Sequence, residues 1–228
     1  MWYLKNQVWF DVCISNFAIS TFIVNHKNLY MIISEDLLVA YGADYEKYEM
    51  NQIIFREGGL PKFYFQIVTG IVELNNYHED GKEFTHNILS GGQSFGESLL
   101  FNDKPYPMTA VSKTQCTILK LNKTDFFNLL NQNHEVCLNM FKCLSDRLYY
   151  KYTMLFSMSS LDPSFKIKTI MDYLKGYNCT DEKYSFQIPL TRQQIANLTG
   201  LRVETVVRTV KKMESEQVVQ IENGKIYY

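Results

Sequence analysis

The chain has 228 residues, of which 46% are hydrophobic and 14% aromatic, and a formal net charge of −1. This length and apolar content can bury one large core or two modest ones, which indicates a globular protein. The cysteines are odd in number and show no C-x-x-C spacing, which argues against a disulfide framework or a thiolate metal site and fits a reducing cytoplasm. They are Cys13, Cys116, Cys137, Cys143 and Cys179.

The net charge is unevenly distributed along the chain. Residues 164–228 hold 10 Lys and Arg against 7 Asp and Glu, a net charge of +3, whereas residues 1–163 hold 13 against 17, a net charge of −4. A modestly basic C-terminal part next to an acidic remainder fits a contact with nucleic acid that is confined to one end of the chain.

Residues 1–30 are rich in apolar residues, but Lys5, Asp11 and Asn16 interrupt the pattern. No apolar run approaches the ~18 residues of a membrane span, and the segment lacks the features of a signal peptide, so we expect no membrane association. Two interpretations stay open. The functional protein begins at Met31, or the segment is a short helix that packs on the domain that follows.

Short β-rich segments separated by glycine-containing turns occupy the chain from residue 48 to residue 121. Many short strands at a spacing of roughly eight to twelve residues predict a sandwich or a barrel. The predicted strands are 49–55, 63–68, 71–77, 83–89 and 117–121.

A long helix is predicted from residue 134 to residue 158, where apolar residues recur near heptad spacing. Its apolar stripe comprises Cys137, Phe141, Leu144, Leu148, Tyr152 and Leu155. Pro163 disfavours helical backbone at Asp162, so we expect a hinge at residues 161–163.

Two short helices are predicted between Leu190 and Met213, in the sequence LTRQQIANLTGLRVETVVRTVKKM. Thr191 suits the N-cap of the first helix, and Gln194, three residues on, can complete a capping box. Gly200 supplies the sharp turn before the second helix. The first helix is expected to bury Ile195, Ala196 and Leu198.

The second helix, from Arg202, is amphipathic at about 100° per residue. Its predicted apolar stripe comprises Val203, Val206, Val210 and Met213. The opposite face carries Glu204, Arg208 and Lys211. A recognition helix for DNA needs such a polar face, although the spacing alone also fits an ordinary surface hairpin of two helices.

Two β-rich runs follow, at 218–221 and 226–228, around Asn223-Gly224, which is a strong signal for a tight hairpin. Helix, turn, helix and hairpin together make a winged helix-turn-helix. The residues TRQQIANLTG followed by VETVVR resemble the DNA-binding motif of the Crp-Fnr family of regulators in residue type and spacing.

The resemblance implies an α+β fold in four parts: an N-terminal extension of undecided role at 1–30, a cyclic-nucleotide-binding-like sensor domain at 31–133, a dimerisation helix at 134–160, and a winged helix-turn-helix domain at 161–228. The sensor domain is expected to be a double-stranded β-helix, a jelly roll. The implied function is that of a cytoplasmic transcription regulator that binds double-stranded DNA at a near-palindromic operator as a homodimer and contacts RNA polymerase.

On this resemblance, Glu204 accepts from a cytosine amino group and Arg208 donates to guanine O6 and N7, so we expect the G-A step that is common in the family's half-sites. The side chains expected to read flanking bases are Val203, Val207 and Arg202. Those expected to bind phosphates are Thr191, Arg192, Thr205 and Lys211.

The sensor pocket departs from the family pattern. Gly96 and Glu97 stand where the family binds ribose, but Pro107 stands where it carries the arginine that neutralises the cyclic phosphate. Lys151 and Tyr152 stand where cyclic-AMP-responsive members carry small hydroxyl residues. We do not expect cyclic AMP to bind, because a buried phosphate without its cation is costly, and the effector stays unidentified. The expected pocket residues are Gly96, Glu97, Ser98, Pro107, Met108 and Tyr152.

Glu97 has a second interpretation, which we favour: a carboxylate at the start of a short helix can cap free amides whether or not a ribose is present.

No enzymatic activity, metal or other cofactor is expected. A jelly-roll enzyme usually needs clustered histidine and carboxylate ligands, and residues 49–121 contain only His78 and His86. A single N-terminal cysteine, Cys13, cannot hold an iron–sulfur cluster. An alternative function is a regulatory module that acts through a protein partner, but such a module has no use for Glu204 and Arg208 spaced for base edges.

Overall fold

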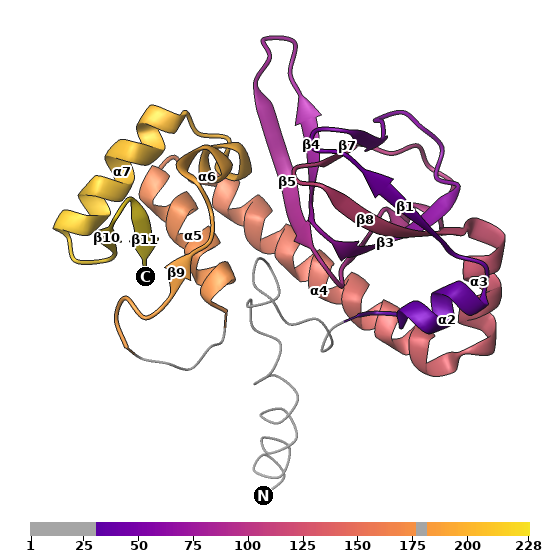
Figure 1. Cartoon of the computed structure of the whole chain (residues 1–228). Helices are drawn as coiled ribbons and strands as arrows, with labels where there is room; N and C mark the ends of the chain where they lie inside the picture. The colour runs from indigo at the N-terminus through magenta and orange to yellow at the C-terminus, as the bar shows by residue number, and fades with distance from the viewer. Residues whose placement is uncertain (1–30, 177–181) are drawn as a thin grey trace, which may run out of the picture. The chain divides into compact units, whose positions relative to one another are not determined.

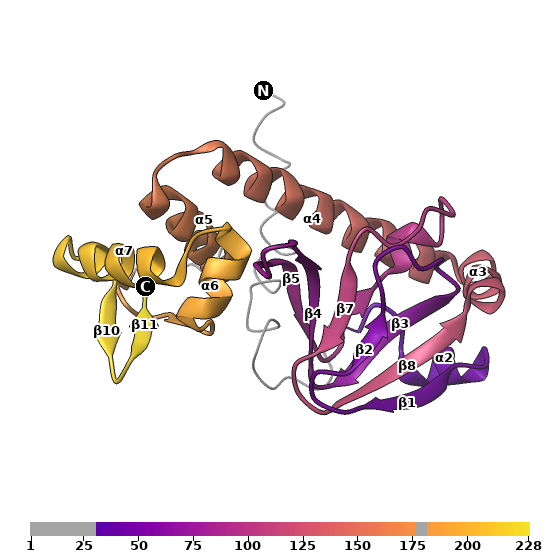
Figure 2. The same cartoon turned by 90° about the horizontal axis from the view of Figure 1, so that it is seen from above.

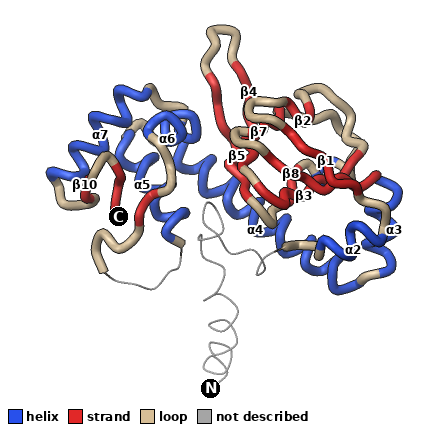
Figure 3. Tube along the Cα trace, viewed as in Figure 1, coloured by secondary structure: helices blue, strands red, loops and turns tan. Residues whose placement is uncertain are grey.

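The computed structural model describes residues 31–176 and 182–228, which divide into two compact units on either side of the Lys151–Tyr152 bond. Strands dominate the first unit and helices the second (Figure 1; Figure 3). Both interpretations of residues 1–30 concern residues outside the described ranges. Within these ranges, no helix has the length and apolar character needed to cross a membrane.

The first unit is built on two four-stranded antiparallel sheets. The first sheet has the order β1 (Asp44–Tyr48), β8 (Cys116–Asn122), β3 (Phe63–Thr69) and β6 (Ser94–Phe95). The second has the order β2 (Ile53–Phe55), β7 (Thr109–Ser112), β4 (Ile71–Tyr77) and β5 (Glu83–Ser90). Phe65, Ile67 and Phe95 of the first sheet pack with Val72 and Leu89 of the second in a common core, as in a β-sandwich. The predicted jelly-roll class is confirmed.

The sequence located five strands of this unit and misplaced the start of one. The predicted strands at 63–68, 71–77, 83–89 and 117–121 are β3, β4, β5 and β8, but the segment 49–55 forms a strand only at Ile53–Phe55. Asn51 adopts a left-handed backbone with φ 65°, so the chain turns before β2. The strands β1, β6 and β7 were missed, and β6 and β7 are only two and four residues long.

The outer face of the first sheet is covered by α2 (Glu35–Ala40), α3 (Lys123–Gln132) and the start of α4 (His134–Ser159). Both α2 and α3 lie beside β8 (Figure 1; Figure 2). Tyr64 of β3 stacks on Phe126 of α3 with ring centroids 4.7 Å apart, and Leu121 and Met140 complete this second core. The core fixes where α4 begins and which of its faces meets the sheets. The short 3-10 helix η1 (Glu97–Leu99) follows β6.

The 26-residue helix α4 confirms the predicted long helix. It buries Met140, Tyr150 and Met154, and it leaves a second apolar stripe exposed. The exposed stripe comprises Leu138, Phe141, Leu148, Tyr149, Tyr152, Leu155 and Phe156, with exposed fractions from 52% to 69%. A stripe of this kind is normally covered in a folded protein.

The second unit holds three further helices and a small sheet. The helix α5 (Pro163–Lys175) begins at the predicted hinge, where Asp162 has extended backbone and accepts from Ser164 N at 2.9 Å. It is followed by α6 (Arg192–Thr199), α7 (Val203–Ser215) and a three-stranded sheet of order β10 (Gln220–Glu222), β11 (Lys225–Tyr227) and β9 (Gln187–Ile188). The strand β9 was not predicted, because two residues are too few to show the apolar–polar alternation of a strand.

Candidate nucleic-acid interface and effector site

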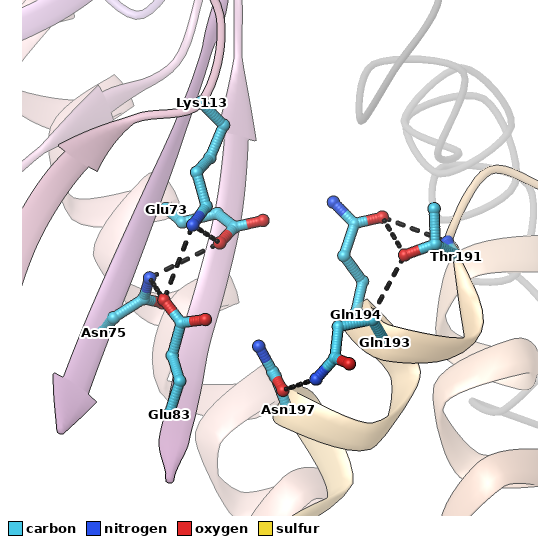
Figure 4. A network of polar contacts seen from close by, with 8 residues as sticks. All are labelled: Glu73, Asn75, Glu83, Lys113, Thr191, Gln193, Gln194 and Asn197. Atoms are coloured by element: carbon cyan, nitrogen blue, oxygen red, sulfur yellow. Dashed lines mark hydrogen bonds and ion pairs between the residues drawn. The ribbon is translucent and has the colours of Figure 1, made fainter. Parts of the chain in front are cut away.

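The turn between α6 and α7 forms as its local signals predict. Thr191 Oγ1 accepts from Gln194 N at 3.1 Å, and Thr191 N donates to Gln194 Oε1 at 3.0 Å, so both halves of the capping box are present (Figure 4). Gly200 ends α6 in the left-handed conformation, with φ 69°. The predicted inward residues Ile195, Ala196 and Leu198 are all buried.

The helix α7 has the two faces that its period predicts. Val206, Val210 and Met213 are buried, Val203 is half-buried, and Thr209 joins them on the inner face. Glu204, Val207, Arg208 and Lys211 are exposed and follow one another at i, i+3, i+4 and i+7, which places them on one side of the helix.

The charges on this outer face are uncommitted. Among the residues that the structure describes, neither Glu204 nor Arg208 takes part in an ion pair, and Lys211 does not either. Arg202 is the exposed N-cap of α7 and Thr205 is half-buried in its first turn. Exposed unpaired side chains on a helix keep their hydrogen-bonding capacity for a partner.

The hairpin of β10 and β11, here called the wing, is attached to α6 and α7 by two hydrogen bonds that the sequence did not predict. Arg192 Nη1 donates to the carbonyl of Gly224 at 2.5 Å, and Ile221 N donates to Glu214 Oε1 at 3.0 Å. The turn itself is tight, because Asn223 and Gly224 both have left-handed backbone, with φ 48° and 75°. Arg192, expected to bind a phosphate, is therefore partly engaged by the wing.

In the first unit, Glu97 is buried at the start of η1 and pairs with an arginine that the sequence did not single out. Arg147 Nη1 donates to Glu97 Oε1, and Arg147 Nη2 donates to the carbonyl of Ser94 at 2.6 Å and to Ser94 Oγ at 3.3 Å. The favoured interpretation of Glu97 as a cap of helix amides is wrong. Its carboxylate faces α4, because a cation stabilises a buried carboxylate more than a backbone amide does.

The other oxygen of Glu97 has no partner. Glu97 Oε2 is buried and accepts no hydrogen bond from any residue in the described ranges. Gly96 beside it has φ 77°, and a Cβ at this position would come within 3.3 Å of the Tyr106 and Phe55 rings, which stack with centroids 3.7 Å apart. Glycine is needed here for both backbone and space.

The remaining expected pocket residues do not converge on Glu97. Ser98, Pro107 and Tyr152 are exposed and Met108 is half-buried. The carbonyl of Pro107 accepts from Asn76 Nδ2 at 2.9 Å. The structure thus brings Gly96 and Glu97 together with Ser94, Tyr106 and Arg147. The only sequence signal for Arg147 is its place one helical turn before Lys151.

Lys151 lies one turn beyond Arg147 on α4. Its Nζ donates to the carbonyl of His86 on β5 at 3.4 Å. Burial and the neighbouring Arg147 charge lower the pKa of Lys151, although the side chain keeps contact with solvent. Burial and the Lys151 charge also lower the pKa of His86 to about 4.

A second polar cluster crosses the β4, β5 and β7 sheet (Figure 4). Lys113 Nζ lies 3.2 Å from Glu73 Oε2 and 3.5 Å from Glu83 Oε1, and Asn75 Nδ2 donates to Glu83 Oε1 at 2.5 Å. Across residues 31–176 and 182–228, no group of three or more histidine, cysteine or acidic side chains is placed to hold a metal ion.

Two family descriptions match the chain. The cyclic nucleotide-binding domain matches residues 45–133, and the Crp-like helix-turn-helix domain matches residues 169–227. The cAMP-activated global transcriptional regulator CRP of Haemophilus influenzae is 26% identical over 175 residues, which cover 76% of this chain and 78% of that protein. The cAMP-activated global transcriptional regulator Vfr of Pseudomonas aeruginosa is 24% identical over 180 residues, covering 77% and 84%.

Solved structures show the same fold at lower identity. A CooA variant from Carboxydothermus hydrogenoformans has a TM-score of 0.70 at 18% identity, covering 91% of this chain and 94% of that one. The c-di-GMP responsive global regulator CLP of Xanthomonas campestris has a TM-score of 0.67 at 19% identity, covering 84% and 96%.

Proposed function

The chain is homologous to the CRP/FNR family of DNA-binding transcription regulators, and from this premise we propose that it binds a near-palindromic operator as a homodimer and answers to an effector other than cyclic AMP. The homologues are regulators rather than enzymes. We place its action in the cytoplasm, with RNA polymerase as a further partner. Action mainly through another protein partner is the weaker alternative, because the helix-turn-helix domain supplies a DNA-binding surface.

The observation that carries the proposal is the uncommitted outer face of α7. Glu204 and Arg208 are one turn apart, exposed, and without an ion pair to the described residues. A carboxylate accepts from cytosine N4 and a guanidinium donates to guanine O6 and N7, so the pair selects a G·C-containing step. Val203, Val207 and Arg202 flank it and would meet the neighbouring bases.

Phosphate contacts would fix the register of this helix without reading sequence. Thr191 and Arg192 lie at the start of α6, and Thr205 and Lys211 lie on α7. Arg192 still has donors beyond the one given to Gly224, because a guanidinium carries five N–H groups. Arg192 would then donate hydrogen bonds both to the wing and to a phosphate.

The exposed stripe of α4 supports the homodimer. Seven large apolar side chains in one row are exposed in a single chain, and they repeat at a spacing suited to a helix pair. Twofold symmetry then requires inverted half-sites about 34 Å apart, the general spacing of helix-turn-helix dimers.

The proposal that the effector is not cyclic AMP rests on the residues expected to form the ligand pocket. The relatives are named for activation by cAMP, but in this chain Pro107 stands at the position expected for the phosphate-binding arginine, and it is exposed and contributes only its carbonyl. One protein of the same fold is described as c-di-GMP responsive, so calorimetric titration of the full chain should include that dinucleotide beside cyclic AMP, and micromolar binding of cyclic AMP would contradict this proposal.

The test selects an operator from random DNA with the full chain and measures its affinity and the oligomeric state. We expect inverted repeats and a dimer. Leu155→Glu on the exposed stripe should weaken the dimer at least tenfold, because burial of a leucine contributes about 1.5–3 kcal/mol, whereas Asn139→Glu, exposed off the stripe, should not. A monomer on DNA without a repeated half-site contradicts the proposal.

A further inference from the structure

The tip of the wing lies beyond the sheet that holds its base. The base is fixed, because Ile226 and Tyr227 of β11 pair with Ile188 and Gln187 of β9. The tip, at residues 222–225, lies past these pairs, so no third strand among the described residues supports it. A two-stranded hairpin is only marginally stable alone, so the direction of the tip depends on its contacts with the helices.

Glu214 in the last turn of α7 supplies one of these contacts. Its Oε1 accepts from Ile221 N of β10 at 3.0 Å. Arg192 of α6 supplies the other, from Nη1 to the carbonyl of Gly224 at 2.5 Å. Partial burial lowers the pKa of Arg192, and the Glu214 charge opposes this shift, so the carboxylate also stabilises the guanidinium. The tip is therefore tied to both helices of the proposed DNA-binding surface.

Glu214 stands at an unfavourable place for a carboxylate. It lies three residues after Lys211, towards the side of α7 proposed to face DNA, where a negative charge repels phosphates. It also lies at the C-terminal end of the helix, where the helix dipole disfavours an anion. Its side chain is exposed and takes part in no ion pair within the described residues. Neither helix stability nor attraction to DNA accounts for a glutamate here, whereas its bond to the wing does.

We propose that Glu214 is a positioning residue for DNA binding, which fixes the tip of the wing and thereby holds the Arg192 side chain in place for a phosphate. Glu214 itself contacts no DNA. When the Ile221 N–H is held, the Gly224 carbonyl stays beside α6, and the remaining N–H groups of Arg192 keep one direction. This inference rests on the DNA-binding function proposed above.

The experiment measures the affinity of the full chain for its selected operator and for random DNA. Coulomb's law alone predicts tighter binding when a carboxylate near DNA is removed. We expect the opposite for Glu214→Ala, which should weaken binding about three- to tenfold, as the loss of one hydrogen bond does. The loss should be equal on operator and random DNA, because phosphate contacts do not read sequence. Glu214→Gln keeps an acceptor for Ile221 N and should bind at least as tightly as the unmodified chain.

Glu216→Ala is the matched control. Glu216 is an exposed glutamate two residues further along the chain, and its Oε1 lies 3.6 Å from Lys212 Nζ instead of meeting the wing. Its removal should leave the affinity for DNA unchanged or raise it. Hydrogen exchange of the Ile221 amide reports the wing contact directly, and it should be faster in Glu214→Ala than in Glu214→Gln.

Two results would overturn the inference: Glu214→Ala binds DNA as tightly as the unmodified chain or tighter, or Glu214→Gln binds as weakly as Glu214→Ala. All affinities are compared below the unfolding midpoint of each variant, so that loss of fold is not mistaken for loss of position. An unmodified chain that binds no operator would contradict the proposed function. Intact operator binding with an unaffected Glu214→Ala would contradict this inference alone.

Discussion

The charged residues of α7 and those of the sensor unit are used in opposite ways. On α7, Glu204 and Arg208 stand exposed and unpaired within the described residues, where water solvates them and their removal costs the fold little. In the sensor unit, Glu97 is buried and paired with the partly buried Arg147, so the carboxylate depends on this cation. The first pair is free for a partner, and the second is committed to the fold.

The largest expected effect comes from breaking the buried pair. Arg147→Met leaves Glu97 buried without its cation and should destabilise the protein by about 3–5 kcal/mol, measured by urea unfolding. The double variant Arg147→Met/Glu97→Leu removes both charges and should lose less than the single variant. If the double variant is as unstable as the sum of the two single variants, the two charges are not coupled as described.

The sensor unit also carries a group, His86, that predicts a loss of stability at acid pH. His86 has a folded-state pKa of about 4, below its ordinary 6.5, so the unfolded chain binds the proton more tightly. The stability that neutral His86 contributes is therefore fully present above pH ~6.5 and is lost as the pH falls towards ~4. His86→Gln should flatten this loss, which we expect to be about 1–3 kcal/mol, and His134→Gln, an exposed control, should not.

The exposed face of α7 should show its effect on DNA and not on the fold. Arg208→Ala should cost about 1–3 kcal/mol on the selected operator and relax the preference at one base pair, with an unchanged unfolding midpoint. The comparison requires operator variants titrated under the same salt conditions. An equal loss on operator and random DNA would refute a base-reading role.

The smallest effect is expected at Lys211. Lys211→Ala should weaken binding to all sequences alike and reduce the salt dependence by about one unit, because one phosphate contact is lost. Lys212→Ala is a suitable control, since Lys212 Nζ lies 3.6 Å from Glu216 Oε1 in the next turn. A base-dependent loss in Lys211→Ala would place this side chain at a base edge instead.

Local sequence signals located most of the secondary structure. The strands β3, β4, β5 and β8 and the long helix were recognised because their periods extend over several residues. The short strands β6 and β9 have two residues each, too few to show a period.

The sequence by itself determined the helix-turn-helix, because its signals act within one or two turns of chain. The Thr191–Gln194 capping box and the turn at Gly200 depend on neighbours that are close in sequence. Only the tertiary structure decided the state of Glu97, because its partner Arg147 is 50 residues away. No local pattern links the two, and burial of the carboxylate is what selects an arginine from the far helix.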